Sequence, residues 1–138
     1  MADVSPAVLT APVTVPFLWL PVAGYMAGIF WLSSQSVLPG ASIIPDWLNY
    51  DWLHHGTAYA GLAMVVVRAL AGGRLRAVGT ATLVGAWTIA TVYGFTDEFH
   101  QSFVPGRTAD PRDLLADGVG AALGLGLVWA WSIIRRSP

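Results

Sequence analysis

The side chains best suited to chemistry gather in residues 91–124, TVYGFTDEFHQSFVPGRTADPRDLLADGVGAALG. Asp97 and Glu98 are adjacent there, and His100 and Gln101 follow within three residues. Carboxylates this close can share a proton or hold a cation, and carboxylates with imidazole suit general acid–base transfer. Long apolar runs flank the stretch, so the charges mark either a membrane boundary or a site carried by the membrane.

Helical spacing indicates which of these groups can act together. Asp97, His100 and Gln101 share a face through i+3 and i+4 spacing, and Glu98 is offset. Two acids at a helix C-terminus oppose the macrodipole, and an acid in the hydrocarbon region costs about 2.5–3.5 kcal/mol. A plain membrane boundary ordinarily carries Arg, Lys or Trp instead. We therefore interpret the two acids as functional, with Asp97, Glu98 and His55 as catalytic candidates.

A second polar group precedes this stretch in DWLHHGTAY. Asp51, His55 and Tyr59 recur at i, i+4 and i+8 and so share one helical face, with His54 about 100° away. An interfacial cap explains an acid near a helix N-terminus and His or Tyr at a membrane surface. Tyr59, however, lies two turns deep on the face of His55. Both interpretations, cap and site, stay open from these residues.

The segment VPGRTADPRD combines turn chemistry with a candidate ligand. Pro105-Gly106 predicts a turn, and Asp110-Pro111 predicts the N-cap and first residue of a helix, so Asp110 is assigned a structural role. Arg107, in the short loop between them, suits bidentate pairing with a carboxylate or capture of a phosphate.

The last helix begins with two more acids. Asp113 and Asp117 are four residues apart, so Asp117 enters the bundle one turn deeper. Like charges at this spacing repel and need partners, which Arg107, Arg112 or the histidines can supply.

Small residues follow these acids at regular spacing. Such faces predict close helix packing with no chemical role, and they also offer a surface for a homo-oligomer. The motifs are Gly120-xxx-Gly124, Gly118-xxx-Ala122-xxx-Gly126 and, earlier in the chain, Gly24-xxx-Gly28.

The composition indicates that a membrane positions these groups. Only 11% of the 138 residues are charged and the mean hydropathy is +0.60, whereas soluble domains carry about 25% charged residues. The formal net charge of −1 gives no electrostatic case for a nucleic-acid partner. With no Cys in the chain, disulfides and thiolate sites are excluded.

Four apolar segments predict an all-α integral membrane bundle of four transmembrane helices. The expected ranges are 16–34, 51–70, 77–98 and 113–134, each near the roughly 20 residues that a bilayer requires. The second is the least secure, because it spans only if its His pair lies at one interface and Arg68 snorkels to the other. Residues 16–136 then form the membrane domain, and 1–15 are a flexible or interfacial lead without the positive start of a signal peptide.

Arginines predict the orientation of this bundle. Arg68, Arg74 and Arg76 lie between the second and third helices, and Arg135 and Arg136 end the chain. Because short loops rich in Lys and Arg stay in the cytoplasm, we expect an N-in, C-in protein of the bacterial cytoplasmic membrane. The start of the second helix, the end of the third and the start of the fourth then meet at the outer face.

Together these residues resemble the VanZ-like family, named after an accessory protein of glycopeptide (teicoplanin) resistance clusters. The resemblance covers about residues 33–124 and includes the SSQ segment at 33–35. Trp52 stands where the family commonly has Lys, and Asp117 stands where Asn is frequent. The family's motif positions fall on Asp51, His55, Tyr59, Asp97, Glu98, Gln101, Pro105, Gly106, Arg107, Asp113 and Asp117. The resemblance implies a small multi-helix envelope protein and leaves its molecular activity open.

The first functional hypothesis is binding. An outer-face pocket would hold the headgroup of a membrane lipid or lipid-linked envelope precursor, with Arg107 on phosphate, and would lower glycopeptide susceptibility. Its ligand-binding residues would be Asp51, His55, Tyr59, Asp97, Glu98, Gln101, Arg107, Asp113 and Asp117.

Three alternatives use the same inventory. A membrane enzyme would take Glu98 or His55 as base and Arg107 as electrophilic stabiliser. A divalent metal could be ligated by Asp97, Glu98, Asp117 and His55, but no spacing is specific enough to predict one firmly. A proton-coupled flippase or carrier would relay protons through paired acids, and a structural partner subunit would use none of these groups.

Overall fold

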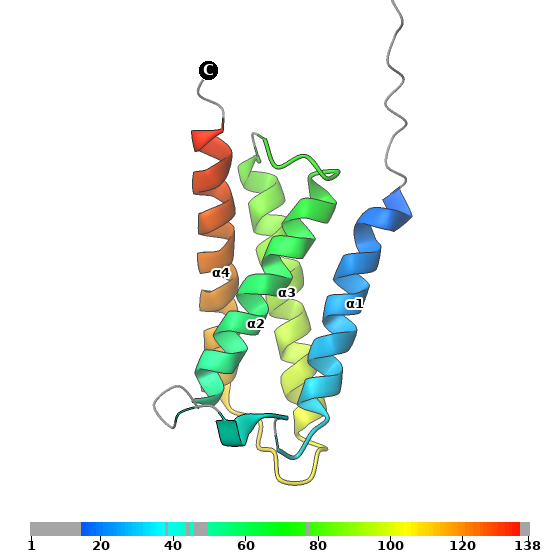
Figure 1. The fold of residues 1–138 in the computed structure, drawn as a ribbon, viewed down its shortest axis with the longest axis vertical. Coiled ribbons are helices and arrows are strands. Elements are labelled where there is room, and N and C mark those ends of the chain that lie inside the picture. The colour runs from blue at the N-terminus through cyan, green and yellow to red at the C-terminus, as the bar shows by residue number, and fades with distance from the viewer. Residues whose placement is uncertain (1–14, 38, 44, 46–49, 77, 136–138) are drawn as a thin grey trace, which may run out of the picture.

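The computed structural model describes residues 15–37, 39–43, 45, 50–76 and 78–135. In these ranges the chain is helical and contains no strand, which confirms the all-α part of the prediction and its four helices. Figure 1 shows four long helices side by side, running alternately up and down. They are α1 (Val15–Ser33), α2 (Asp51–Leu70), α3 (Thr80–Gln101) and α4 (Pro111–Ile134), with a short 3-10 helix, η1 (Ala41–Ile43), between α1 and α2.

The boundaries of α3 differ most from the expected 77–98, by three residues at each end. Gly79 takes an extended conformation (φ −79°, ψ 158°) directly before the helix, and Ala77 lies outside the described residues. At the other end the helix continues through Gln101, because turn chemistry begins only at Pro105-Gly106, where Gly106 has a φ of +83°. The extension places Gln101 on the helix itself.

The start of α4 confirms the interpretation of Asp110 as an N-cap. Its side chain accepts a hydrogen bond of 2.8 Å from the Arg112 backbone N–H, and Pro111 is the first helical residue. The helix therefore begins two residues before the expected 113. The predicted lead lies outside the described residues for positions 1–14, as does Arg136.

Helix α2 forms the centre of the bundle and contacts the other three helices. Leu62, Ala63, Val66 and Val67 on α2 are all fully buried. The other helices therefore cover much of α2, and His55 is buried, whereas His54 is half-buried and Arg68 in the last turn is exposed.

Glycines bring α2 and α4 into close contact. A Cβ added at Gly120 would fall on the Gly56 carbonyl, and one at Gly124 would lie 2.6 Å from the Ala60 carbonyl oxygen. The predicted Gly120-xxx-Gly124 face therefore packs within one chain. Gly126, by contrast, has no atom within 4 Å of its added Cβ among the described residues, so it lies on an open face.

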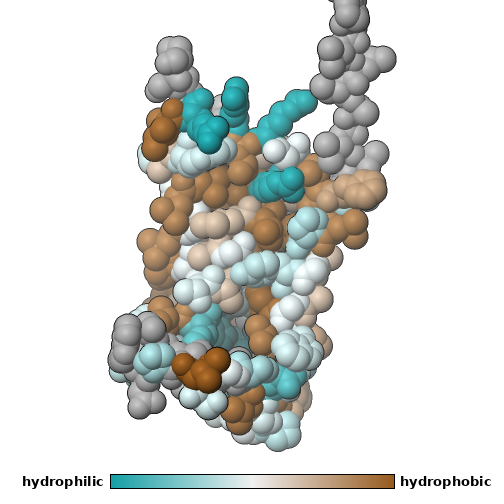
Figure 2. All heavy atoms as spheres, viewed as in Figure 1, coloured by the Kyte–Doolittle hydropathy of each residue, from teal (hydrophilic) through white to brown (hydrophobic). Residues whose placement is uncertain are grey.

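Two helices are long and apolar enough to cross a membrane by length and composition, at Pro16–Ser33 and Pro111–Ile134. Figure 2 shows apolar side chains over the middle of the molecule and hydrophilic ones toward its ends. Large exposed apolar side chains come mainly from α1, α3 and α4, and they include Phe17, Leu20, Phe30, Trp31, Val84, Val92, Phe95, Phe99, Leu115, Leu123 and Leu127. A surface of this kind suits contact with lipid better than contact with water.

Candidate functional site

Helices α1 and α3 end, and α2 and α4 begin, at the same end of the bundle (Figure 1). Polar side chains converge at this end. The structure brings all nine residues of the predicted ligand-binding set to this end. Seven of them are buried, Arg107 has a side chain 11% exposed, and Asp51 is open to solvent at 53%. The buried seven are His55, Tyr59, Asp97, Glu98, Gln101, Asp113 and Asp117.

His55 on α2 lies at the centre of this cluster. Its Nδ1 atom is 3.0 Å from Asp117 Oδ1 and 3.8 Å from Glu98 Oε1. Asp117 is fully buried, and it fits because Gly94 on α3 has no side chain: a Cβ there would lie 2.6 Å from Asp117 Oδ2. Helices α2, α3 and α4 therefore each contribute one group to a single contact.

Glu98 uses one carboxylate oxygen for structure. Its Oε2 atom accepts a 2.9 Å hydrogen bond from the Asp110 backbone N–H, which fixes the loop that leads into α4. Its Oε1 atom is buried and has no hydrogen-bond partner among the described residues. Glu98, His55 and Asp113 each offer a ligand atom within 4.8 Å of the other two, so these three could hold a metal ion.

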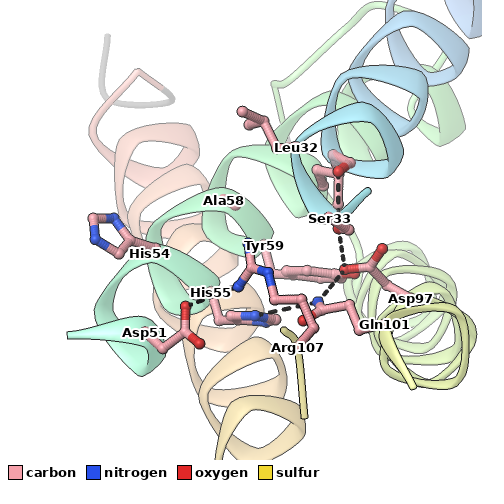
Figure 3. A pocket seen from close by; sticks show the side chains of 11 residues that line it. Leu32, Ser33, Asp51, His54, His55, Ala58, Tyr59, Asp97, Gln101 and Arg107 are labelled. Atoms are coloured by element: carbon pink, nitrogen blue, oxygen red, sulfur yellow. Dashed lines mark hydrogen bonds and ion pairs between the residues drawn. The ribbon is translucent and has the colours of Figure 1, made fainter. Parts of the chain in front are cut away.

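Asp97 is tied to α1 rather than to this trio. Its Oδ2 atom accepts hydrogen bonds from Ser33 Oγ at 2.8 Å and from Gln101 Nε2 at 3.2 Å. Figure 3 shows Ser33, Asp97 and Gln101 joined in this way beside Tyr59. The candidate metal ligands from the sequence included Asp97 and Asp117, whereas the grouped ligand atoms belong to His55, Glu98 and Asp113.

Arg107 lies between Asp51 and Gln101 and beside the His55 ring in Figure 3. Its Nε–H donates to the Gln35 carbonyl oxygen at 3.0 Å, and one terminal nitrogen lies 3.4 Å from Asp51 Oδ1. A guanidinium has five N–H donors, so donors remain that have no hydrogen-bond partner in the described part of the chain. The backbone of the loop after α1 thus positions a cation with spare donors.

Two hollows meet at Arg107 and Asp51. The inner one, about 70 Å³, has apolar walls from Ile29, Leu32 and Ala58 and reaches His55, Tyr59 and Asp97. The outer one, about 560 Å³, is lined by polar residues that include Arg112 and Asp113. Since one water needs about 10–15 Å³ on this measure, the inner hollow admits a few waters or one functional group. The outer hollow has room for a headgroup.

Two expectations about individual residues change with the structure. His100 does not join Asp97: its Nε2 atom is 3.1 Å from Ser34 Oγ, and its ring stacks on Phe30 with centroids 4.2 Å apart. His54 lines the inner hollow, although helical phase placed it away from His55.

Sequence reasoning also missed three contributors. Ser33 binds Asp97, Gln35 binds Arg107 through its carbonyl, and Gly94 makes room for Asp117. The SSQ segment at 33–35 was the available signal for the first two, because it belonged to the family resemblance and had no other assigned role.

The site gathers more negative charge than the nearby side chains can neutralise. Asp97, Glu98, Asp113 and Asp117 are all buried, and His55 is the one basic side chain in ion-pair contact with any of them among the described residues. Buried, unpaired charges are strongly unfavourable, so such a cluster binds protons or a cation. It can therefore support acid–base chemistry, metal binding or recognition of a cationic group, whereas Arg107 beside it is the group suited to phosphate.

A comparison with protein families finds one that fits nearly the whole chain. The family model described as VanZ/LLP1 matches residues 15–134. No curated protein and no solved structure matches the chain. The match extends the resemblance at 33–124 through α1 and to the end of α4.

Proposed function

The chain belongs to the VanZ/LLP1 family, and from that premise we propose that it binds a phosphate-bearing lipid headgroup at the outer face of the bacterial cytoplasmic membrane. Membership of this family is consistent with a membrane protein that is associated with resistance. The ligand would be a phospholipid or a lipid-linked envelope precursor, and its capture would lower susceptibility to glycopeptides such as teicoplanin.

The lengths of the helices support four spans. The four contain 19, 20, 22 and 24 residues, and at about 1.5 Å per residue each matches a hydrocarbon core of about 30 Å. Helix α2 packs against the other three, so it would enter the bilayer together with α1 and α4 even though its own hydropathy is lower.

The arrangement of charge supports the N-in, C-in orientation. Arg68, Arg74, Arg76 and Arg135 lie at the end of the bundle opposite the acid cluster, at the end of α2, in the α2–α3 connection and after α4. Under the positive-inside rule that end faces the cytoplasm and the cluster faces outward.

The position of Arg107 is the observation on which the proposal depends. It is nearly buried, is positioned by the Gln35 carbonyl and keeps free donors at the junction of the two hollows. Guanidinium groups bind phosphate through paired N–H donors. A headgroup in the outer hollow would meet Arg107, and its lipid chain would lie beside the apolar α1 wall at Ile29 and Leu32.

Titration of the purified protein in nanodiscs tests this directly. The probes are a polyprenyl monophosphate and, as the neutral comparison, diacylglycerol, with native mass spectrometry counting bound lipid. We expect Arg107→Ala to weaken binding of the phosphate lipid by about 10- to 100-fold, the range for charge-assisted hydrogen bonds. Arg74→Ala removes an exposed arginine from the opposite end and serves as the matched control with unchanged binding. Equal binding of both lipids, or no effect of Arg107→Ala, would overturn the proposal.

A cellular assay tests the link to resistance. Expression in a sensitive bacterium is expected to raise the teicoplanin concentration that inhibits growth. Arg107→Ala and Glu98→Gln should each abolish this effect while the protein still inserts and accumulates. If both variants keep full function, the chain acts as a structural partner subunit instead.

One contact favours an enzyme as the second candidate. His55 Nδ1 lies 3.0 Å from Asp117 Oδ1, a pairing that orients an imidazole as a general base. Conversion of the bound phosphate lipid to product would establish the enzyme, and binding without turnover would leave the binding protein. Lipid flux across a liposome that stops when the proton gradient collapses would instead indicate a flippase.

A further inference from the structure

The cluster behind Arg107 has a geometry that headgroup binding does not require. We propose that His55, Glu98 and Asp113 form a site for a divalent transition metal such as Zn²⁺ or Mn²⁺. The proposal stands independently of lipid binding, because it concerns groups deeper than Arg107 and is tested with the metal alone.

The spacing of the ligand atoms is the first argument. Two ligand atoms that are each about 2.0–2.2 Å from one ion lie at most about 4.3 Å apart. His55 Nδ1 is 3.8 Å from Glu98 Oε1, so this pair already meets the limit. Asp113 joins His55 and Glu98 in a set whose atoms all lie within 4.8 Å. A small rotation of the Asp113 side chain would close the site.

An unpartnered oxygen is the second, independent argument. Glu98 Oε1 points toward His55, is fully buried and has no hydrogen-bond partner in the described ranges. The other oxygen of the same carboxylate is well bonded to the Asp110 backbone, which holds the group in this orientation. A buried carboxylate oxygen without a partner is unfavourable unless an ion or proton occupies the space before it.

The donor set favours a transition metal. One imidazole nitrogen with several carboxylate oxygens suits Zn²⁺ or Mn²⁺, whereas Ca²⁺ and Mg²⁺ prefer oxygen ligands alone. A divalent ion would also offset the excess negative charge of the cluster.

The site also has a route to solvent. Asp113 lines the outer hollow together with Arg107 and Arg112, although it is itself buried. An ion can therefore reach the cluster from the outer face, and the three ligands come from three helices that the fold already fixes in place.

Metal binding to the full-length chain in detergent tests the inference. After EDTA treatment and dialysis, the protein is titrated with Zn²⁺ and Mn²⁺ by calorimetry, and bound metal is counted by mass spectrometry. We expect one ion per chain, a rise in the thermal midpoint on loading, and a ligand-field absorption band when Co²⁺ replaces the ion. Less than a tenth of an ion per chain at micromolar free metal, for both ions, would overturn the inference.

Variants assign the ion to this cluster. Glu98→Gln keeps shape and the bond to Asp110 while removing one ligand, and it should weaken binding by at least about 10-fold. His55→Asn should do the same, and if it fails to fold, Glu98→Gln alone decides. His100→Asn is the matched control, since it removes an imidazole that contacts Ser34 and Phe30 outside the cluster. Equal affinity in Glu98→Gln and the unaltered chain, or loss of the ion in His100→Asn alone, would show that the metal binds elsewhere.

The outcomes of the two sets of experiments are separable. Metal bound with no preference for phosphate lipid would leave this inference standing and remove the proposed function. Phosphate lipid bound by the metal-free protein, with no metal uptake, would do the reverse.

Discussion

At the scale of single residues, the Tyr59 hydroxyl is unusual. The side chain is 1% exposed, and its ring lies parallel to that of His55 with centroids 6.3 Å apart. Its hydroxyl is buried without a hydrogen-bond partner among the described residues. An unsatisfied hydroxyl of this kind costs about 1–3 kcal/mol, so we attribute its presence to ligand binding rather than to stability.

Removal of the Tyr59 hydroxyl distinguishes a role in ligand binding from a role in stability. Tyr59→Phe should leave the thermal midpoint unchanged or raise it slightly, because the ring packing remains and an unpaired polar atom disappears. The same variant should bind the phosphate lipid more weakly than the unaltered protein in the nanodisc titration. A fall of several degrees in the midpoint with unchanged lipid binding would show that the hydroxyl stabilises the fold.

The residues of the site were largely predictable, because helical spacing places groups of one helix relative to one another. Spacing gives no information on partners from distant helices. Ser33 and Asp97 are 64 residues apart, and Gly94 supports Asp117 across a helix interface. The contacts of His100 with Ser34 and Phe30 likewise depend on where the end of α1 packs against α3. That arrangement is a property of the packed bundle.

At the scale of elements, the contact between α2 and α4 holds the site together. Its closest points are Gly120 against Gly56 and Gly124 against Ala60. Since His55 is on α2 and Asp117 is on α4, any increase in the distance between these helices moves the two groups apart.

Paired alanine substitutions test this contact. Gly120→Ala places a methyl on the Gly56 backbone, and overpacking of this kind costs about 1–3 kcal/mol. Gly126→Ala, on an open face of the same helix, is the matched control and should be neutral or slightly stabilising. Unfolding by titration with SDS measures both. Equal stability of the two variants would contradict the close approach of the helices.

Helix existence was predictable from apolar length and from the Asp110-Pro111 start, and the expected and observed ranges of α2 coincide. The end of α3 was not predictable, because the sequence has no Gly or Pro between Thr96 and Pro105 that would mark where the helix stops. The central position of α2 was also not predictable. Its lower hydropathy signalled a doubtful span, whereas the structure shows a helix covered by three others.

At the scale of the whole molecule, the up-and-down order separates charge by end. Helices α1 and α3 finish where the acids gather, and the connection of α2 to α3 carries arginines at the opposite end (Figures 1 and 2). This polarity predicts the direction of the chain in the membrane.

Cysteine labelling tests that direction, and the chain offers a background without Cys. Thr108 and Thr80 are exposed at the two ends, so Thr→Cys at each makes a matched pair. A membrane-impermeant maleimide should label Thr108→Cys in intact cells and Thr80→Cys only after the membrane is opened. Labelling of both in intact cells, or the reverse pattern, would exclude the N-in, C-in arrangement.

Helix α1 is fastened to α3 by two hydrogen bonds, Ser33 Oγ to Asp97 Oδ2 at 2.8 Å and Tyr93 hydroxyl to the Met26 carbonyl at 2.7 Å. The same helix forms the apolar wall of the inner hollow. If the proposed lipid enters sideways past Ile29, it has to move α1 against the Ser33–Asp97 hydrogen bond, and lipid binding would then be thermodynamically linked to the position of α1. Loss of the Ser33 hydrogen bond would then ease entry from the lipid phase, and it would also leave Asp97, one of the predicted ligand-binding residues, with one hydrogen bond fewer.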